Sequence, residues 1–137
     1  MDPGNEILIV SKWMSATIGT LSGAVSGAYL DLIPSGIAFP AVRYHAQYST
    51  DTSVVEGVRV LARIDWLVVV VREGLEVAPL VPIAASLDTV LHLATGTADA
   101  LSITCVRQQP FGLVESAKSG VQYRHVGGIY RTIVVKT

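Results

Sequence analysis

The stretch that decides the fold is VRVLARIDWLVVVV, residues 58–71. Its even-numbered positions are apolar throughout. Its odd-numbered positions carry Arg59, Leu61, Arg63 and Asp65, and they are apolar without exception from Leu67 onward. Such a pattern predicts one β-strand that is half-buried where it begins and buried on both faces where it ends.

The length of this strand bears on how the protein assembles. At about 3.3 Å per residue, fourteen extended residues span about 46 Å. A compact domain of this size has a diameter of roughly 37 Å. We therefore expect the strand to bend or to project, and a projecting valine-rich strand favours pairing with another chain.

The rest of the chain predicts two helices and several shorter strands. Apolar residues at helical spacing indicate a first helix, which Asp2-Pro3 opens and the glycines from Gly19 onward close, and a second helix over residues 79–94. Gly127-Gly128 predicts a two-residue turn, because a type I′ turn needs positive φ at both positions. The remaining expected segments are strands 29–33, 41–48, 102–108, 121–126 and 129–136, and a polar loop over 49–57.

This order of elements predicts a single α+β domain over residues 1–137. We expect an antiparallel β-sheet with a long central strand, two helices packed on it, and a C-terminal β-hairpin. The low charge and the long strand favour a subunit whose surface is covered by other copies or by partners.

Composition narrows the function classes. Of 137 residues, 50% are hydrophobic and 15% are charged, which excludes intrinsic disorder. The net charge of −1 gives no basic footprint for nucleic acid. A single cysteine, Cys105, excludes an internal disulfide framework and a cysteine-rich metal site. A mean hydropathy of +0.50 indicates either a membrane segment or a surface covered by copies or partners.

A membrane segment is the weaker of those two interpretations. Residues 13–30 lack charge, and Gly19, Gly23 and Gly27 repeat at a spacing found in membrane helix contacts. However, serine and threonine lower the apolarity of the segment, and no basic cluster flanks it. We therefore expect an amphipathic helix and no membrane partner. The apolar stripe of this helix consists of Ile7, Val10, Met14, Thr17, Ile18 and Leu21.

Residues suited to catalysis or metal binding do not form a recognisable pattern. His45, His92 and His125 have no second ligand at metal spacing, and no glycine-rich loop opens a helix. A Cys105–His125 pair within one sheet is conceivable, but nothing in the sequence around either residue supports it. The sequence therefore predicts no enzyme activity, no catalytic residue, no cofactor and no metal.

Charged residues near the predicted turns are the candidate interface. The Gly127-Gly128 turn would place Arg124 opposite Arg131, and like charges directly opposite each other are unfavourable. The two guanidinium groups therefore point into solvent or meet acids of a neighbouring strand, or they meet carboxylates of another subunit. Two interpretations are also open for the charged residues beside the 49–57 loop, which are Arg59, Arg63 and Asp65. They form a solvated face of the strand, or they project into a partner. The candidate interface residues are Asp51, Glu56, Arg59, Arg63, Asp65, Arg124 and Arg131.

Several stretches resemble a known family. The C-terminal segments CVRQQPFGL, residues 105–113, and GVQYRHVGGIYR, residues 120–131, resemble the end of small tail terminator (tail completion) proteins of long-tailed bacteriophages. YLDLIP, residues 29–34, followed by Phe39-Pro40, is similar to an extended segment and Phe-Pro pair in the same group. Chain length and the order of elements agree as well.

The resemblance implies a structural protein of the virion, assembled in the host cytoplasm. It implies a homohexameric ring on the head-proximal end of the tail tube, which stops tube polymerisation and joins head-completion proteins. Its implied partners are other copies of itself, the major tail tube protein and a head-completion or stopper protein. DNA would pass through the ring without specific binding.

Two alternatives remain open from the sequence. The chain is another ring-forming neck or tail-tube component of the same particle. Alternatively, it is a small-ligand-binding or enzymatic α+β domain, which predicts a pocket near Cys105 and His125.

Overall fold

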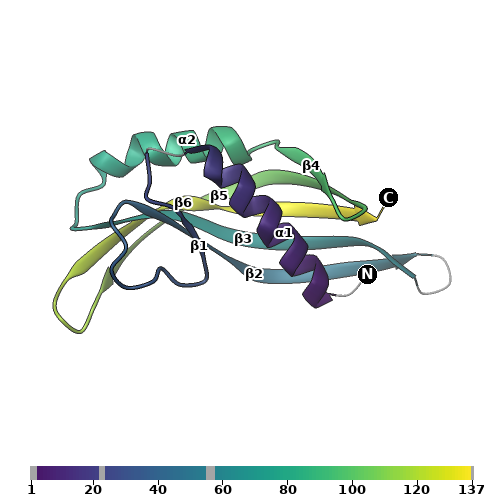
Figure 1. The fold of residues 1–137 in the computed structure, drawn as a ribbon, viewed down its shortest axis with the longest axis horizontal. Coiled ribbons are helices and arrows are strands. Elements are labelled where there is room, and N and C mark those ends of the chain that lie inside the picture. The colour runs from purple at the N-terminus through teal and green to yellow at the C-terminus, as the bar shows by residue number, and fades with distance from the viewer. Residues whose placement is uncertain (1–2, 22–23, 55–57, 137) are drawn as a thin grey trace.

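A computed structural model describes residues 3–21, 24–54 and 58–136 of the protein, with backbone alone for 3–5, 51–54 and 58–60. Its architecture is α+β, as predicted, with two helices and one curled, mixed six-stranded sheet (Figure 1). The strand order is β1-β2-β3-β6-β5-β4. The elements are α1 (Pro3–Ile18), the 3₁₀ helix η1 (Gly19–Leu21), β1 (Ala28–Leu30), β2 (Ala41–Val54), β3 (Val58–Glu73), the 3₁₀ helix η2 (Ala78–Leu80), α2 (Val81–Leu91), β4 (Thr95–Ala98), β5 (Leu101–Ser116) and β6 (Gln122–Lys136).

The long strand predicted over 58–71 is confirmed as β3, at the centre of the sheet. Its last half is buried on both faces, and Val68, Val69 and Val70 are fully buried. The expectation that it needs another chain for pairing is wrong. β3 pairs with β2 from Val58 to Val71, and its other edge pairs with β6 from Leu61 onward.

Both helices cover one face of the sheet and form the main core. The stripe predicted on α1 is confirmed, because Val10, Met14 and Ile18 are almost completely buried. Leu87 and Leu91 of α2 join them over the sheet around Trp66. We call the sheet face opposite the helices the open face.

The first predicted strand is shorter than expected, and the sheet is not purely antiparallel. β1 runs parallel to β2, with Ala28 beside Val42. Parallel neighbours need a connection that returns the chain to the same end of the sheet, and residues 31–40 provide it. Asp31 begins this connection with a φ of 65°.

The polar loop predicted over 49–57 is largely strand. Residues 49–54 continue β2, so that β2 and β3 form one long hairpin, while residues 55–57 lie outside the described part. Serine and threonine tolerate the extended backbone, and β-branched threonine favours it. Thr50 pairs with Arg63, and Thr52 pairs with Leu61.

The C-terminal hairpin exists, but its turn is not at Gly127-Gly128. Both glycines lie in the middle of β6, and the chain turns between Ala117 and Gly120, where Gly120 has a φ of 85°. The two glycines allow the neighbouring strands to approach closely, because they carry no side chain. A Cβ atom on Gly127 would lie 2.8 Å from Val69 Cα.

Among the described residues, no helix is both long enough and apolar enough to cross a bilayer. Residues 13–30 do not form one continuous helix either. α1 ends at Ile18, and β1 begins at Ala28.

Candidate functional site

Two residues predicted for the interface, Arg131 and Asp65, form an ion pair with each other within the chain. Arg131 lies opposite Asp65 across the β3–β6 pair. Its Nε donates to Asp65 Oδ1 at 3.0 Å, and its Nη2 donates to Oδ2 at 3.5 Å. The interpretation that Arg131 meets an acid of a neighbouring strand is therefore confirmed for this residue.

Arg124 lies seven residues from Arg131 on the same strand, so the predicted pairing of the two arginines is wrong. Its Nε and Nη2 donate to the backbone carbonyl of Leu75, at 3.0 and 2.9 Å. Arg124 thus fixes the connection between β3 and η2 against β6.

The other predicted residues belong to the β2–β3 hairpin. The Arg63 guanidinium lies over the ring of Tyr48, 5.6 Å from its centroid, on the same face as Asp65. Asp51 and Arg59 are placed in β2 and β3 by their backbones. Glu56 lies outside the described residues. The hairpin therefore collects four of the candidates, whereas Arg124 lies toward the other end of the sheet.

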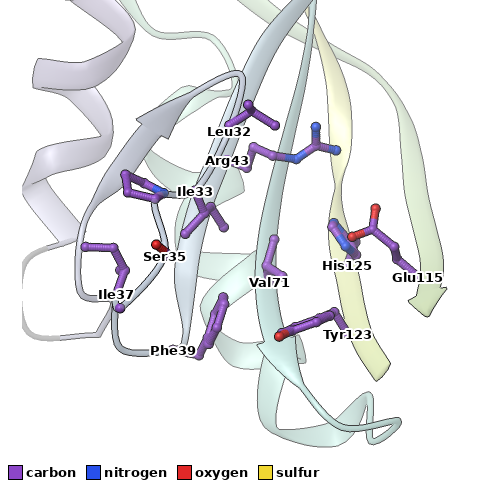
Figure 2. Close-up of a pocket in the computed structure, with 12 residues that line it drawn as sticks. Leu32, Ile33, Ser35, Ile37, Phe39, Arg43, Val71, Glu115, Tyr123 and His125 are labelled. Atoms are coloured by element: carbon purple, nitrogen blue, oxygen red, sulfur yellow. The ribbon is translucent and has the colours of Figure 1, made fainter. Parts of the chain in front are cut away.

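The alternative hypothesis of a ligand-binding domain predicted a pocket near Cys105 and His125, and the structure has a pocket that is lined by His125 but not by Cys105, on the open face. Residues 31–40 cross this face and cover Leu67, Val69 and Val71, leaving a pocket of about 360 Å³ (Figure 2). We call it the 31–40 pocket. Its lining residues are Leu32, Ile33, Pro34, Ser35, Gly36, Ile37, Phe39, Arg43, Val71, Glu115, Tyr123 and His125.

His125 is the unusual residue of this pocket. It is only 4% exposed, and neither ring nitrogen has a hydrogen-bond partner among the described residues. Burial lowers the pKa of His125 below its ordinary value; Glu115 acts against this shift, and Arg43 adds to it. The ring is therefore neutral at pH 7 and offers one donor nitrogen and one acceptor nitrogen.

Arg43 adds a second unsatisfied group to the same pocket. Its Nε is buried without a partner in the described part of the chain. Its Nη1 makes only long contacts, 3.4 Å to the carbonyl of Asp31 and 3.5 Å to His45 Nδ1. Buried polar groups normally have partners, so Arg43 and His125 are the groups of this pocket that an ordered water or a bound group would satisfy.

The Cys105–His125 pair considered from the sequence does not form. Cys105 is fully buried on the helix side of the sheet, whereas His125 lines the open face. Burial, and then the charge of Asp88, raises the pKa of the Cys105 thiol to about 12. This thiol is therefore an inert core group.

No group of three or more metal-binding side chains occurs among the residues that the structure describes. The sequence matches no protein-family model, and no curated protein matches it.

The position of His125 follows from the two-residue period of β6 once that strand is continuous. The mistaken turn at Gly127-Gly128 hid this signal.

Proposed function

We propose that this chain is a structural subunit of a phage particle, a tail terminator that caps the head-proximal end of the tail tube as a ring. The observation that supports it best is the shape of the sheet, which ends in two long edges without strand partners. In the described part of the chain, β1 and the residues before it cover the β2 edge only as far as Tyr44, and β4 with residues 92–94 covers the β5 edge only as far as Arg107.

The two free edges are complementary in direction. β2, β3, β6 and β5 are each antiparallel to the next, so β5 runs antiparallel to β2. A second copy in the same orientation would therefore place its β2 beside the β5 edge as a regular antiparallel pair. A contact between two different edges repeats from copy to copy and closes into a ring when the rotation allows it.

Pro110 limits this contact on the β5 side. Proline lacks an N–H donor and is tolerated in a strand where its nitrogen faces a free edge. Pairing with a neighbouring copy would then be concentrated on residues 111–116, near the turn of the β5–β6 hairpin. That hairpin and the β2–β3 hairpin extend from opposite ends of the sheet (Figure 1).

Such a ring stops tube growth by geometry and needs no catalytic group. One rim would match the last ring of the tube protein, and the other would present a different surface to a head-completion protein. We propose six copies per ring, with assembly in the host cytoplasm and a final place in the virion. A net charge of −1 suits a channel through which DNA passes without specific binding.

The proposal is tested by the mass of the purified chain and by its effect on tube length. Light scattering should give a discrete ring of about six copies, in keeping with closed cyclic symmetry. Added to polymerising tail-tube subunits, the chain should shorten the tubes and remain at one end in electron micrographs. A strict monomer with no effect on tube length contradicts the proposal, and open-ended tubes of this chain alone would assign it to the tube itself.

Val114 provides a matched pair of variants for the edge contact. It lies four residues beyond Pro110 with no register shift between them, so its N–H points to the same free edge. Val114→Pro should reduce ring formation and leave the circular dichroism spectrum unchanged, whereas Val114→Ala should assemble normally. Normal ring assembly by Val114→Pro would exclude the β5 edge from the contact.

A further inference from the structure

The 31–40 pocket restricts the chemistry of its occupant. Its walls are apolar and partly aromatic, with Phe39 and Tyr123 in ring contact at a centroid distance of 5.4 Å. At one side it offers His125, which needs both a donor and an acceptor, and Arg43, whose Nε needs an acceptor. A flat apolar group that carries one hydroxyl fits the apolar walls and can pair one of the two His125 ring nitrogens.

The charges around the pocket favour a neutral occupant. Arg43 contributes a positive charge, and Glu115, which lies beside His125, contributes a negative one (Figure 2). The two opposite charges leave no net charge in the pocket for an ionic occupant to balance. A hydroxyl group on an aromatic ring is neutral, and it both donates and accepts a hydrogen bond.

Tyr48 supplies this group on the same face of the sheet. Its side chain is 53% exposed although it is a large aromatic residue. Tyr48 lies opposite Asp65 in β3, on the open face, and the Arg63 guanidinium stacks on its ring. Within one chain it lies on the β2–β3 hairpin, toward the end of the sheet away from the 31–40 pocket (Figure 1).

We propose that the 31–40 pocket receives Tyr48 of a second copy of this chain, whose phenol hydroxyl bonds His125. This rests on the edge-to-edge contact of the proposed function. In that arrangement, β2 of the second copy lies beside β5 and two strand spacings, about 10 Å, from β6, which carries His125. The open faces of both copies form one surface, and Arg63 of the second copy approaches Glu115.

This contact has two different sides, and every copy carries both of them. Tyr48 lies on one side of each copy and the pocket on the other, so the contact can repeat until a ring closes. Each copy fills a pocket and has its own pocket filled. The exposed Tyr48 and the unsatisfied His125 would then both be buried and paired in the assembly.

The test is a double-mutant cycle of self-association with Tyr48→Phe and His125→Phe, measured by analytical ultracentrifugation. Each single variant should weaken association between copies roughly three- to tenfold, because it removes one side of the same hydrogen bond. The double variant should be no weaker than either single variant. Independent, additive losses, or no loss in either single variant, would overturn the proposal.

A stability measurement separates a role in assembly from a role in folding. His125→Phe removes a buried polar group without partners, so the isolated subunit should resist urea at least as well as the parent chain. If His125→Phe does not fold, His125→Ala takes its place in the cycle. Leu93→Ala is the control, because Leu93 is 66% exposed at the end of α2, and it should change neither property.

A soluble phenol provides an independent readout. Millimolar 4-methylphenol should compete with Tyr48 and dissociate the assembly, whereas 4-methylanisole, which has no hydroxyl donor, should have a much weaker effect. Equal effects of the two compounds would contradict the hydrogen bond to His125.

The outcome is distinguishable from that of the proposed function. Copies that associate through Tyr48 and His125 but never shorten tail tubes would refute only the terminator function. Rings that cap tubes normally with Tyr48→Phe and His125→Phe would refute only the pocket contact.

Discussion

At the residue scale, the strand periodicity placed side chains on the correct face but did not identify their partners. The alternation in residues 58–71 put Asp65 on the face that carries the charges, as observed. Its partner Arg131 was not identified, because the turn assumed at Gly127-Gly128 placed Arg131 opposite Arg124. Partners across a sheet depend on register, and register depends on where the chain turns.

The Asp65–Arg131 pair should contribute to folding of the single subunit. Arg131→Glu places two carboxylates next to each other, so the free energy of unfolding should fall by about 1 kcal/mol. Urea unfolding followed by circular dichroism measures this change. Combining it with Asp65→Arg should restore most of the loss, because opposite charges then face each other again.

An exposed residue on the same strand provides the control for this pair. Lys136→Glu should leave the urea midpoint unchanged, since Lys136 is exposed near the end of β6. An unchanged midpoint for Arg131→Glu would mean that the ion pair contributes nothing to folding.

At the element scale, amphipathic periods predicted the helices and the long strand well. Apolar spacing placed α1 and α2 nearly correctly, and the alternation over 58–71 found β3. The errors occurred at glycines and at polar β-branched residues. Gly127-Gly128 has the composition of a turn, and the serines and threonines of 49–54 have the composition of a loop. In both cases pairing with another strand decided the conformation: Gly127-Gly128 pair with β3 and β5, and residues 49–54 pair with the first half of β3.

Gly127→Ala should be strongly destabilising because of this close packing. The new methyl group would meet the backbone of β3 at Val68 and Val69, which cannot move without breaking the sheet. We expect a loss of about 2–3 kcal/mol in the free energy of unfolding, as for overpacked cores. Thermal or urea denaturation measures it.

Gly112→Ala is the matched control in the neighbouring strand. Its added Cβ would lie 3.9 Å from the nearest atom, the carbonyl oxygen of His125. The change should therefore cost less than about 0.5 kcal/mol, in line with other substitutions that disturb no packing. Equal losses at both glycines would show that strand propensity, and not the close approach to β3, is responsible.

At the scale of the whole molecule, the α+β class followed from the sequence, but the second face of the sheet did not. The chain returns from β1 to β2 across the open face, and only this crossing creates the 31–40 pocket. No apolar period marks residues 31–40, so the sequence alone gave no reason to place them over Val69 and Val71. The 31–40 pocket depends on how the chain connects β1 to β2, whereas the main core follows from the apolar periodicity of the helices and strands.

Cys105 should report the opening of the whole domain. It is fully buried in the main core, and its pKa of about 12 keeps it as a thiol at pH 8. Labelling with a thiol reagent should therefore be very slow in the native protein and should accelerate with the same urea midpoint as circular dichroism. Rapid labelling well below that midpoint would reveal a local opening of the layer between α2 and the sheet.

The two ends of the sheet differ in one more practical respect. Pro3 and Lys136 both lie near the end of the sheet at which β2 and β3 are joined (Figure 1). Residues 31–40 and the turn of the β5–β6 hairpin lie at the other end. Molecules attached to a surface through either terminus would therefore present the end of the sheet that carries His125 and the 31–40 pocket to the solution.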